Sequence, residues 1–247
     1  MASDSQYDVI GAAYDAVKDL PAARYAEIPT VRSLLGDLTG LAVLDVGCGT
    51  GHYSRICREL GAATVVGADS SAKMIAEARR RESTSTAPIS YHVHDAAALP
   101  LLGTYDVVLA VYLFNYAPDR ATVRSMLRSI HANCRDGTRI VALLTDANAP
   151  LTRPELRTYK IEYTIVKESS DVVELDFTAH CDPLVTLRLH APRRDVLNDC
   201  LHSEGFREVH WRTTPVSPTG LEQFGGDYWV SYQEIMPWIT FTAIAST

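Results

Sequence analysis

VLDVGCGTGHY, residues 43–53, is the stretch that decides the fold of this 247-residue chain. Its apolar start is typical of a buried parallel strand, and a helical pattern begins directly after the glycines at positions 47, 49 and 51. Glycine is needed where a chain turns tightly and lets a ligand approach its backbone. The N–H groups at a helix start favour an anionic group. The stretch therefore predicts a strand, a ligand-binding turn and a helix in direct succession.

The same alternation continues on both sides of this stretch. Apolar runs that predict strands lie at residues 41–47, 64–68, 89–93, 105–111 and 138–144. Helical patterns lie between them, at residues 52–60, 71–81 and 120–134. Strands that alternate with helices at this spacing form βαβ units with right-handed crossovers. We therefore expect a doubly wound, Rossmann-like α/β fold around a parallel sheet.

The flanking segments follow different patterns. Residues 1–40 have amphipathic helical spacing and predict an N-terminal helical cap. Strand-like runs without intervening helices follow Pro150, so residues 150–191 predict an antiparallel β insertion. A helix at 193–203 and strands at 208–213 and 238–244 then complete the core. We expect one domain with a cap (1–40), a ligand-binding core (41–149), the insertion (150–191) and C-terminal core strands (192–247).

Composition excludes several classes of function. The chain has 23 basic and 30 acidic residues, a net charge of −7, whereas binding to a nucleic-acid backbone needs a basic field. No apolar run reaches the roughly 20 residues of a membrane span, and the start of the chain lacks a signal-peptide pattern. Five scattered cysteines without a CxxC pair predict neither a disulfide framework nor a zinc site. We expect a cytoplasmic enzyme with no metal and no nucleic-acid or membrane partner.

Acidic residues stand beside the glycine loop and at two strand ends. Asp45 would repel a pyrophosphate and suits a ligand that carries an ammonium group. Asp69 ends the second strand, where an acid commonly holds ribose hydroxyls. Asp95, after His94 at the end of the third strand, can contact an adenine edge. The G-x-G-x-G spacing and Asp45 together disfavour a nicotinamide oxidoreductase, which prefers G-x-G-x-x-G.

These motifs, in this order, resemble those of the class I S-adenosylmethionine-dependent methyltransferases. The resemblance rests on DVGCGTG at 45–51, on Asp69 with Ser70 and Met74, on HDA at 94–96 and on YDV at 105–107. It implies a seven-stranded sheet whose last strand is antiparallel, and we assign that strand to 238–244. It also implies S-adenosylmethionine as cofactor, S-adenosylhomocysteine as product, and no metal.

The resemblance further implies where the cofactor binds. The methionine amino group is expected near Gly47 with Asp45 in support, the ribose on Asp69, and the sulfonium near Val111. Ser70 replaces the bulkier apolar residue that many family members carry after the acid, which weakens the adenine contact expected there. The implied cofactor residues are Tyr14, Asp45, Gly47, Cys48, Gly49, Gly51, Asp69, Ser70, Met74, His94, Asp95, Ala96 and Val111.

A narrower resemblance concerns the N-terminal cap. Tyr7, Gly11, Tyr14 and the run LPAARYAEIPT at 20–30 are similar to the caps of small-molecule N-methyltransferases, of which those of the toxoflavin pathway are nearest. This resemblance implies a small-molecule acceptor from secondary metabolism. The expected acceptor atom is a nitrogen of a heteroaromatic or amine metabolite, and the expected assembly is a monomer or a homodimer.

Aromatic residues of the cap and core are the candidates for the acceptor pocket, because an aromatic wall stacks on a flat ring and attracts a sulfonium cation. The candidate catalytic residues are Tyr14, Tyr112 and His180, and the candidate substrate residues are Tyr7, Tyr25, Phe114, Asn115 and Trp229. Core packing is the simpler role for these aromatic residues, and an exposed or hydrogen-bonded role is the simpler one for His180. His52 and His131 fall on predicted surface helices and are expected in solvent.

Two alternatives to N-methylation stay open at this stage. An amine needs little base before it attacks a sulfonium methyl, whereas a hydroxyl must be deprotonated, so O-methylation requires a nearby base. A protein of the same fold can also bind the cofactor without catalysing a reaction. The segment YLFNYAP at 112–118 lacks the Asn/Asp-Pro-Pro-aromatic pattern that DNA amino-methylating enzymes carry, which further disfavours a nucleic-acid substrate.

Overall fold

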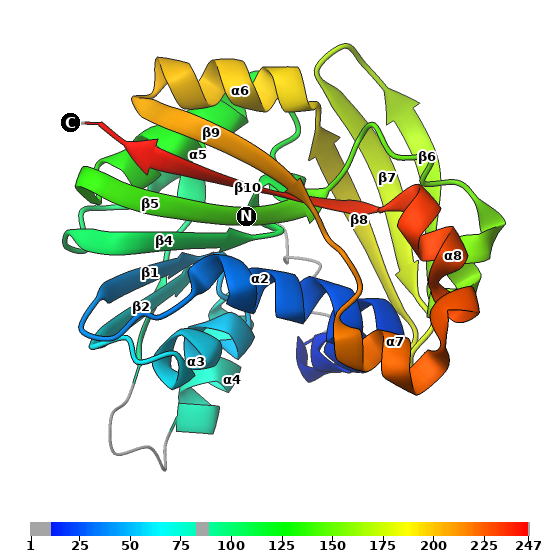
Figure 1. The fold of residues 1–247 in the computed structure, drawn as a ribbon. Helices are drawn as coiled ribbons and strands as arrows, with labels where there is room; N and C mark the ends of the chain where they lie inside the picture. Colours follow the sequence, from blue (N-terminus) through cyan, green and yellow to red (C-terminus); the bar gives the residue numbers. More distant parts are fainter. Residues whose placement is uncertain (1–10, 83–88, 247) are drawn as a thin grey trace.

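A seven-stranded sheet forms the centre of the computed structural model, which describes residues 11–82 and 89–246, with side chains from residue 15 onward (Figure 1). The strands are β1 (Ala42–Val46), β2 (Thr64–Asp69), β3 (Ser90–Val93), β4 (Tyr105–Val111), β5 (Cys134–Thr145), β9 (Phe206–Thr213) and β10 (Trp238–Ala245). Their order is β3-β2-β1-β4-β5-β10-β9. Strands β1 to β5 pair in parallel, and β10 pairs antiparallel with both β5 and β9. The expected seven-stranded sheet with an antiparallel last strand is confirmed.

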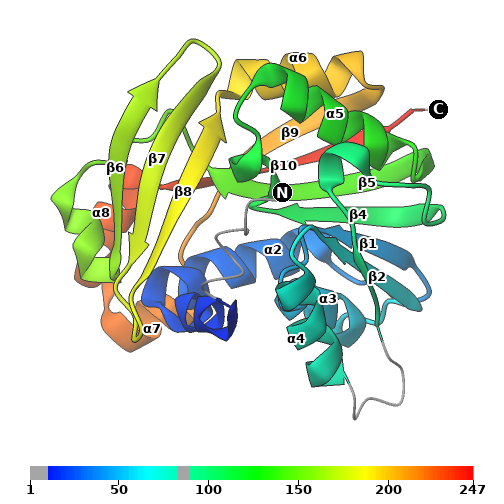
Figure 2. The same cartoon turned by 180° about the vertical axis from the view of Figure 1, so that it is seen from behind.

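Helices cover both faces of this sheet, as Figure 2 shows. On one face lie α2 (Ile28–Leu35), α3 (His52–Glu59) and α4 (Ala72–Glu82), and on the other lie α5 (Arg120–His131) and α6 (Arg194–Ser203). Successive strand residues alternate between two buried clusters, so Val43 packs with the first layer and Leu44 with the second. This burial on both faces explains why the strands are continuous apolar runs rather than alternating ones.

The N-terminal segment adopts helical turns that lead into α2. These turns are η1 (Gly11–Asp19) and the π-helical η2 (Ala23–Glu27). They contact each other, and η1 also contacts β8 and α4. Residues of η1 and η2 also contact the glycine loop and Tyr112, so these turns lie at the carboxyl edge of the main sheet, which is the edge where open α/β sheets bind ligands.

A second, smaller sheet stands beside that edge. It consists of β6 (Ile161–Glu168), β7 (Val172–Ala179) and β8 (Val185–Pro192), paired antiparallel in chain order. Alternate residues of β7, including Leu175 and Phe177, are buried in the same cluster as the first helical layer. The expected antiparallel insertion is confirmed, and the small sheet stands beside the carboxyl ends of the main-sheet strands (Figures 1 and 2).

Two helices near the C-terminus were not expected from the sequence. They are α7 (Pro218–Phe224) and α8 (Gly226–Ile235), and Ser217 caps the first by accepting a hydrogen bond from the Gly220 N–H at 3.3 Å. Their glycine-containing segment shows weak helical periodicity, and α8 forms because Trp229 and Tyr232 are buried against distant parts of the chain. A short 3₁₀ helix, η5 (Pro154–Tyr159), was also not expected.

Two further features concern the length of the helices and the state of the cysteines. In residues 11–82 and 89–246, no helix combines the length and the apolar character that a bilayer crossing requires. All five cysteines are free thiols.

Candidate active site

The glycine loop connects β1 to α3 with a backbone that only glycine adopts readily. Gly47, Gly49 and Gly51 have φ angles of 75°, 54° and 80°. The Gly47 and Cys48 N–H groups donate to the Ala68 carbonyl at 2.8 and 3.1 Å, which ties the loop to the end of β2. At Gly51 a Cβ would lie 2.2 Å from the Tyr91 hydroxyl oxygen, so a side chain has no room there. The loop therefore keeps its backbone close to the sheet edge.

Asp69 connects the end of β2 to this loop. Its Oδ2 accepts a hydrogen bond from the Gly49 N–H and its Oδ1 accepts one from the Ser71 N–H, both at 2.9 Å. Each carboxylate oxygen can accept more than one hydrogen bond. The Asp69 carboxylate can therefore hold ligand hydroxyls while it still orders the loop.

Asp45 lies deeper, at the end of β1. It is 1% exposed, and its Oδ2 accepts a hydrogen bond from the Ser54 hydroxyl at 2.6 Å. Burial raises the pKa of Asp45 to about 7, against the lowering effect of the Ser54 bond. A cationic ligand group beside this carboxylate would stabilise its charged form.

Most of the predicted cofactor residues converge on one cavity of about 400 Å³, which we call the main cavity. Its lining comprises Gly47, Gly49, Asp69, Ser70, His94, Asp95, Ala96, Ala97, Val111, Tyr112, Leu113, Tyr116, Thr122 and Met126. The carboxyl ends of β1 to β4 and the turns after them contribute most of these residues, because parallel strands present their ends at one sheet edge. The volume is in the range of small-molecule sites.

Five of the lining residues were not identified from the sequence. They are Ala97, Leu113, Tyr116, Thr122 and Met126. Thr122 and Met126 lie on α5, which packs on the short helix η3 (Ala96–Ala98). No local pattern marks these two residues, since only the packing of α5 brings them to the cavity.

Four of the remaining predicted cofactor residues do not line the main cavity. Asp45 and Cys48 line an adjoining space of about 40 Å³, the loop cavity, whose lining is Asp15, Lys18, Asp45, Gly47, Cys48, Gly49, Thr50, His52, Tyr53, Val111 and Tyr112. Gly51 shapes the loop, and Met74 is buried in α4. The side chain of Tyr14 lies outside the described residues.

His52 was expected in solvent, and the structure corrects this expectation. It lines the loop cavity, and its Nε2 is buried with no hydrogen-bond partner among the described residues. Burial, with the nearby Lys18 charge, lowers the pKa of His52 to about 4. His52 is therefore a neutral imidazole at the glycine loop. His131 is also not simply solvated, because its Nε2 lies 3.1 Å from the Ser246 carbonyl.

Tyr112 stands at the junction of the cavities. It follows β4 directly, has a φ of 60°, and its N–H donates to the Leu143 carbonyl at 2.6 Å. A positive φ is strained for a residue with a side chain and is maintained only where the surroundings impose it. The Tyr112 hydroxyl donates to Glu27 Oε2 at 2.9 Å.

A buried charged cluster surrounds that contact and was missed in the sequence. Lys18 of η1 forms an ion pair with Glu27 of η2, and the Tyr53 hydroxyl donates to Glu27 at 2.6 Å. The Lys18 Nζ also lies 5.1 and 5.0 Å from the ring centroids of Tyr53 and Tyr112. The cluster joins the N-terminal segment to the end of β4. No spacing in the sequence links Lys18 to Glu27, so only the packing of η1 against η2 reveals the pair.

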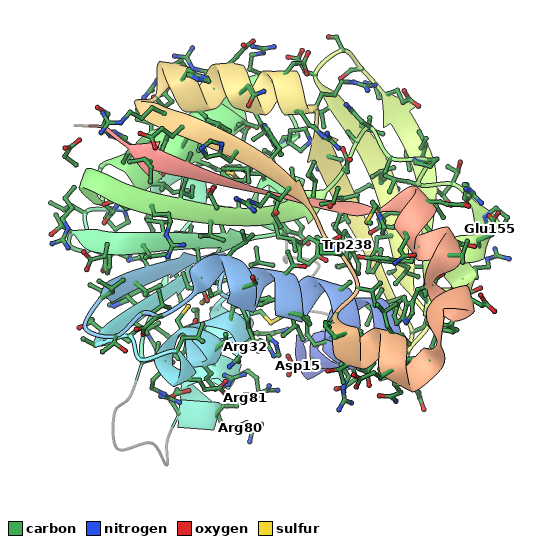
Figure 3. The ribbon with its side chains drawn as sticks, viewed as in Figure 1. Asp15, Arg32, Arg80, Arg81, Glu155 and Trp238 are labelled. Carbon is green, nitrogen blue, oxygen red and sulfur yellow. The ribbon has the colours of Figure 1, made fainter. Side chains whose placement is uncertain are left out.

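A third space, the inner chamber, lies between the main sheet and the smaller sheet. It measures about 20 Å³ and is lined by Val17, Tyr112, Tyr116, Thr145, Tyr163, Phe177, Leu187, Leu189 and Trp238. Trp238, labelled in Figure 3, begins β10 at this position, and its Nε1 donates to the Tyr163 hydroxyl at 2.9 Å. Tyr112 and Tyr116 line both this chamber and the main cavity, so they separate the two.

Three predicted substrate residues are packing residues in the structure. Phe114 is fully buried against Phe241, with ring centroids 5.9 Å apart. Trp229 is fully buried on α8, where its ring stacks on Tyr159 at 5.3 Å. Tyr25 packs edge to face with Phe224 at 5.5 Å. None of the three lines any of the three cavities described here, so we do not assign them to the site.

Asn115 and His180 also do not line any of the three cavities. Asn115 Oδ1 accepts from the Thr145 N–H at 3.1 Å, and its Nδ2 donates to the His190 carbonyl at 3.1 Å. It therefore bridges the two sheets. The His180 side chain is 43% exposed and lies 3.2 Å from Glu162, far along the insertion, which removes it as a candidate base. Tyr7 lies outside the described residues.

In the described part of the chain, no group of three or more histidine, cysteine, aspartate and glutamate side chains is arranged to hold a metal ion.

Comparison with known proteins connects this geometry to a family. Residues 43–137 match the family described as a methyltransferase domain. The chain is 35% identical over 131 residues to a demethylmenaquinone methyltransferase of Lactococcus lactis, covering 51% of this chain and 48% of that protein. It is 41% identical over 83 residues to a ubiquinone biosynthesis O-methyltransferase of Rhizobium rhizogenes, covering 33% of each. The chain thus spans half or less of the length of these curated relatives.

Solved structures extend the similarity to the whole fold. An S-adenosylmethionine-dependent methyltransferase from Mesorhizobium loti has a TM-score of 0.64 at 18% identity, covering 92% of this chain and 99% of that one. The magnesium protoporphyrin IX methyltransferase of Synechocystis, solved with S-adenosylmethionine bound, has a TM-score of 0.60 at 16% identity and full coverage of both chains. The [4+2]-cyclase SpnF also shares the fold, with a TM-score of 0.62 at 16% identity and coverage of 99% and 96%. The chain therefore has the fold of S-adenosylmethionine-dependent methyltransferases, and its residues 43–137 match a methyltransferase-domain family.

Proposed function

We propose that this protein transfers the methyl group of S-adenosylmethionine to a nitrogen of a small heteroaromatic or amine metabolite. The observation that carries the proposal is the Asp69 carboxylate, held against the glycine loop at the edge of a 400 Å³ cavity. This arrangement suits a nucleoside that continues into a zwitterionic amino acid. The match to a methyltransferase domain supports the same ligand.

Each part of the cofactor has a proposed partner. Asp69 accepts hydrogen bonds from the ribose hydroxyls, and the adenine lies beside residues 94–97 of the main cavity. The methionine end extends toward the loop cavity, where its ammonium group neutralises Asp45 and His52 offers an uncharged ring nitrogen. The sulfonium then lies near Val111, which lines both cavities.

Methyl transfer is an in-line displacement in which a lone pair attacks the methyl carbon. The new bond to carbon forms as the carbon–sulfur bond breaks, and its electron pair stays on sulfur to give S-adenosylhomocysteine. The protein's task is to hold the nucleophile about 3–3.5 Å from the carbon and to exclude water. The inner chamber adjoins the proposed sulfonium position at Tyr112, and we place the acceptor there.

The lining of the inner chamber favours a nitrogen nucleophile. Among the described residues that line it there is no lysine, histidine, aspartate or glutamate. A neutral amine or ring nitrogen needs no base before it attacks, whereas a hydroxyl does.

O-methylation is the second candidate, and one contact favours it. The Tyr112 hydroxyl reaches Glu27 at 2.9 Å, so a proton lost by an acceptor hydroxyl can pass through Tyr112 to that carboxylate. One curated relative is itself an O-methyltransferase by name. In this case the methylation rate of the true acceptor would rise with pH as one group loses its proton. Substitution of Tyr112 by phenylalanine would abolish that rise.

Methyl-labelled S-adenosylmethionine, incubated with a panel of small amines, azaheterocycles and phenols, tests the proposal, with S-adenosylhomocysteine binding measured by calorimetry in parallel. We expect label on a nitrogen and tight binding of the product cofactor. Label on oxygen would select the alternative. Tight binding without transfer to any acceptor would indicate a cofactor-binding protein, and a fold that also serves a cyclase makes this control necessary. No binding would refute the cofactor assignment.

A further inference from the structure

Thr145, the last residue of β5, carries a buried hydroxyl without a partner. The residue is fully buried, and its Oγ1 makes no hydrogen bond to any described residue. Its backbone N–H is satisfied by Asn115, so the strand itself is complete at this point. A buried hydroxyl without a hydrogen bond lowers stability, and such a group in a native protein requires an explanation.

Buried threonines elsewhere in the main sheet are paired. The Thr138 hydroxyl donates to the Tyr105 carbonyl at 2.6 Å, and the Thr240 hydroxyl donates to the Arg212 carbonyl at 2.9 Å. Thr240 is as fully buried as Thr145 and lies on β10, which pairs with β5. Among the buried threonines of the main sheet, Thr145 therefore differs from Thr138 and Thr240 in having an unpaired hydroxyl.

The surroundings of Thr145 define what could satisfy it. It lines the inner chamber, whose other walls include the rings of Tyr163, Phe177 and Trp238 and aliphatic side chains from β8. No lining residue among those described is charged. Burying a charged group without a charged partner is strongly unfavourable, whereas flat apolar rings pack well against aromatic walls.

We infer that Thr145 is the hydrogen-bonding anchor for the methyl acceptor, and that the acceptor is an uncharged aromatic ring with one amine, hydroxyl or ring nitrogen. This inference rests on the proposed function and adds the class of acceptor to it. A threonine hydroxyl both donates and accepts, so it pairs with any of these groups. The chamber measures only about 20 Å³, so binding a ring requires its walls, which include Tyr112 and Tyr116, to move apart.

The experiment compares three variants of the full chain, each saturated with S-adenosylhomocysteine. Thr145→Val removes the unpaired hydroxyl at nearly constant shape, Thr145→Ser retains it, and Thr240→Val removes a paired hydroxyl from the adjacent strand. The probes are aniline and phenol as neutral rings and 4-aminobenzoate and 4-hydroxybenzoate as their anionic counterparts. Binding is followed by ligand-observed NMR titration, and stability by the thermal midpoint.

We expect the parent protein to bind the neutral rings at least tenfold more tightly than the anionic ones. Thr145→Val should weaken neutral-ring binding about tenfold with an unchanged or higher midpoint, since no hydrogen bond of the folded protein is lost. Thr145→Ser should restore the affinity. Thr240→Val should lower the midpoint and leave the affinity unchanged, because its hydroxyl has a structural partner.

Several outcomes would overturn the inference. Equal binding of neutral and anionic rings, or no binding of either neutral ring by the parent, would exclude this acceptor class. Unchanged ring affinity in Thr145→Val would mean that the hydroxyl serves a trapped water or the fold. If the parent does not bind S-adenosylhomocysteine, the proposed function itself fails, so the calorimetric titration separates the two failures.

Discussion

The buried ion pair between Lys18 and Glu27 allows a quantitative prediction. The two side chains are 7% and 1% exposed, and two tyrosine hydroxyls complete the shell of Glu27. Lys18→Met removes the cation and leaves the carboxylate buried with only neutral partners. Breaking a buried pair from one side costs about 3–5 kcal/mol, because the remaining charge stays desolvated. For a chain of this size we expect the thermal midpoint to fall by about 10 °C.

The double variant Lys18→Met, Glu27→Gln tests the cause of this loss. It buries no charge, so it should be more stable than Lys18→Met alone by about 2–4 kcal/mol. The exposed pair of Arg32 and Glu59, with side chains 40% and 60% exposed, is the matched control, and removing either partner should cost about 0–1 kcal/mol. Urea unfolding of all variants measures these differences. The single variant Glu27→Gln completes the comparison. The reasoning would be refuted if the losses of unfolding free energy in the two single variants added up to the loss in the double variant. It would also be refuted if Lys18→Met lost no more stability than the variants of the control pair.

Three further predictions concern the glycine loop and its acids. Asp69→Ala should weaken S-adenosylhomocysteine binding by about 1–3 kcal/mol by calorimetry, through the loss of charge-assisted bonds, and an unchanged affinity would contradict the ribose assignment. Burial raises the pKa of Asp45 from its ordinary 3.8 to about 7, so the folded protein binds an extra proton between these values. The free energy of unfolding therefore falls as the pH rises across that range, and Asp45→Asn should flatten this profile in urea titrations at several pH values. Gly51→Ala should lower the thermal midpoint more than Gly36→Ala does, since both have positive φ but only a Cβ at Gly51 meets the Tyr91 hydroxyl, and equal losses would mean that the clash relaxes.

Local sequence signals predicted the core of the fold well. The strand runs at 105–111 and 172–179 match β4 and β7, since buried strands must be apolar and bounded by turn residues. The same signals placed Asp69 and the glycine loop at one sheet edge, because parallel strands all end there. The helices α7 and α8 were missed because their stability comes from Trp229 and Tyr232 packing against η5, which follows β5 far away in the chain.

The chemistry of the proposed acceptor site was less accessible from the sequence. Aromatic residues such as Phe114 and Trp229 were predicted to line a pocket, but both are fully buried in the core. Lys18, Glu27 and Thr145 were not identified, since no spacing in the sequence distinguishes them from other charged or hydroxyl-bearing residues.

By itself, the sequence determined the succession of strands and helices, the glycine loop and the acids beside it, because each depends on residues close together along the chain. Only the tertiary structure decided which side chains face the inner chamber and which fill the core. The reason is physical: the direction of a side chain at a sheet edge depends on how the insertion and the N-terminal segment pack over it. The unpaired hydroxyl of Thr145 and the buried pair of Lys18 and Glu27 exist only in that packing.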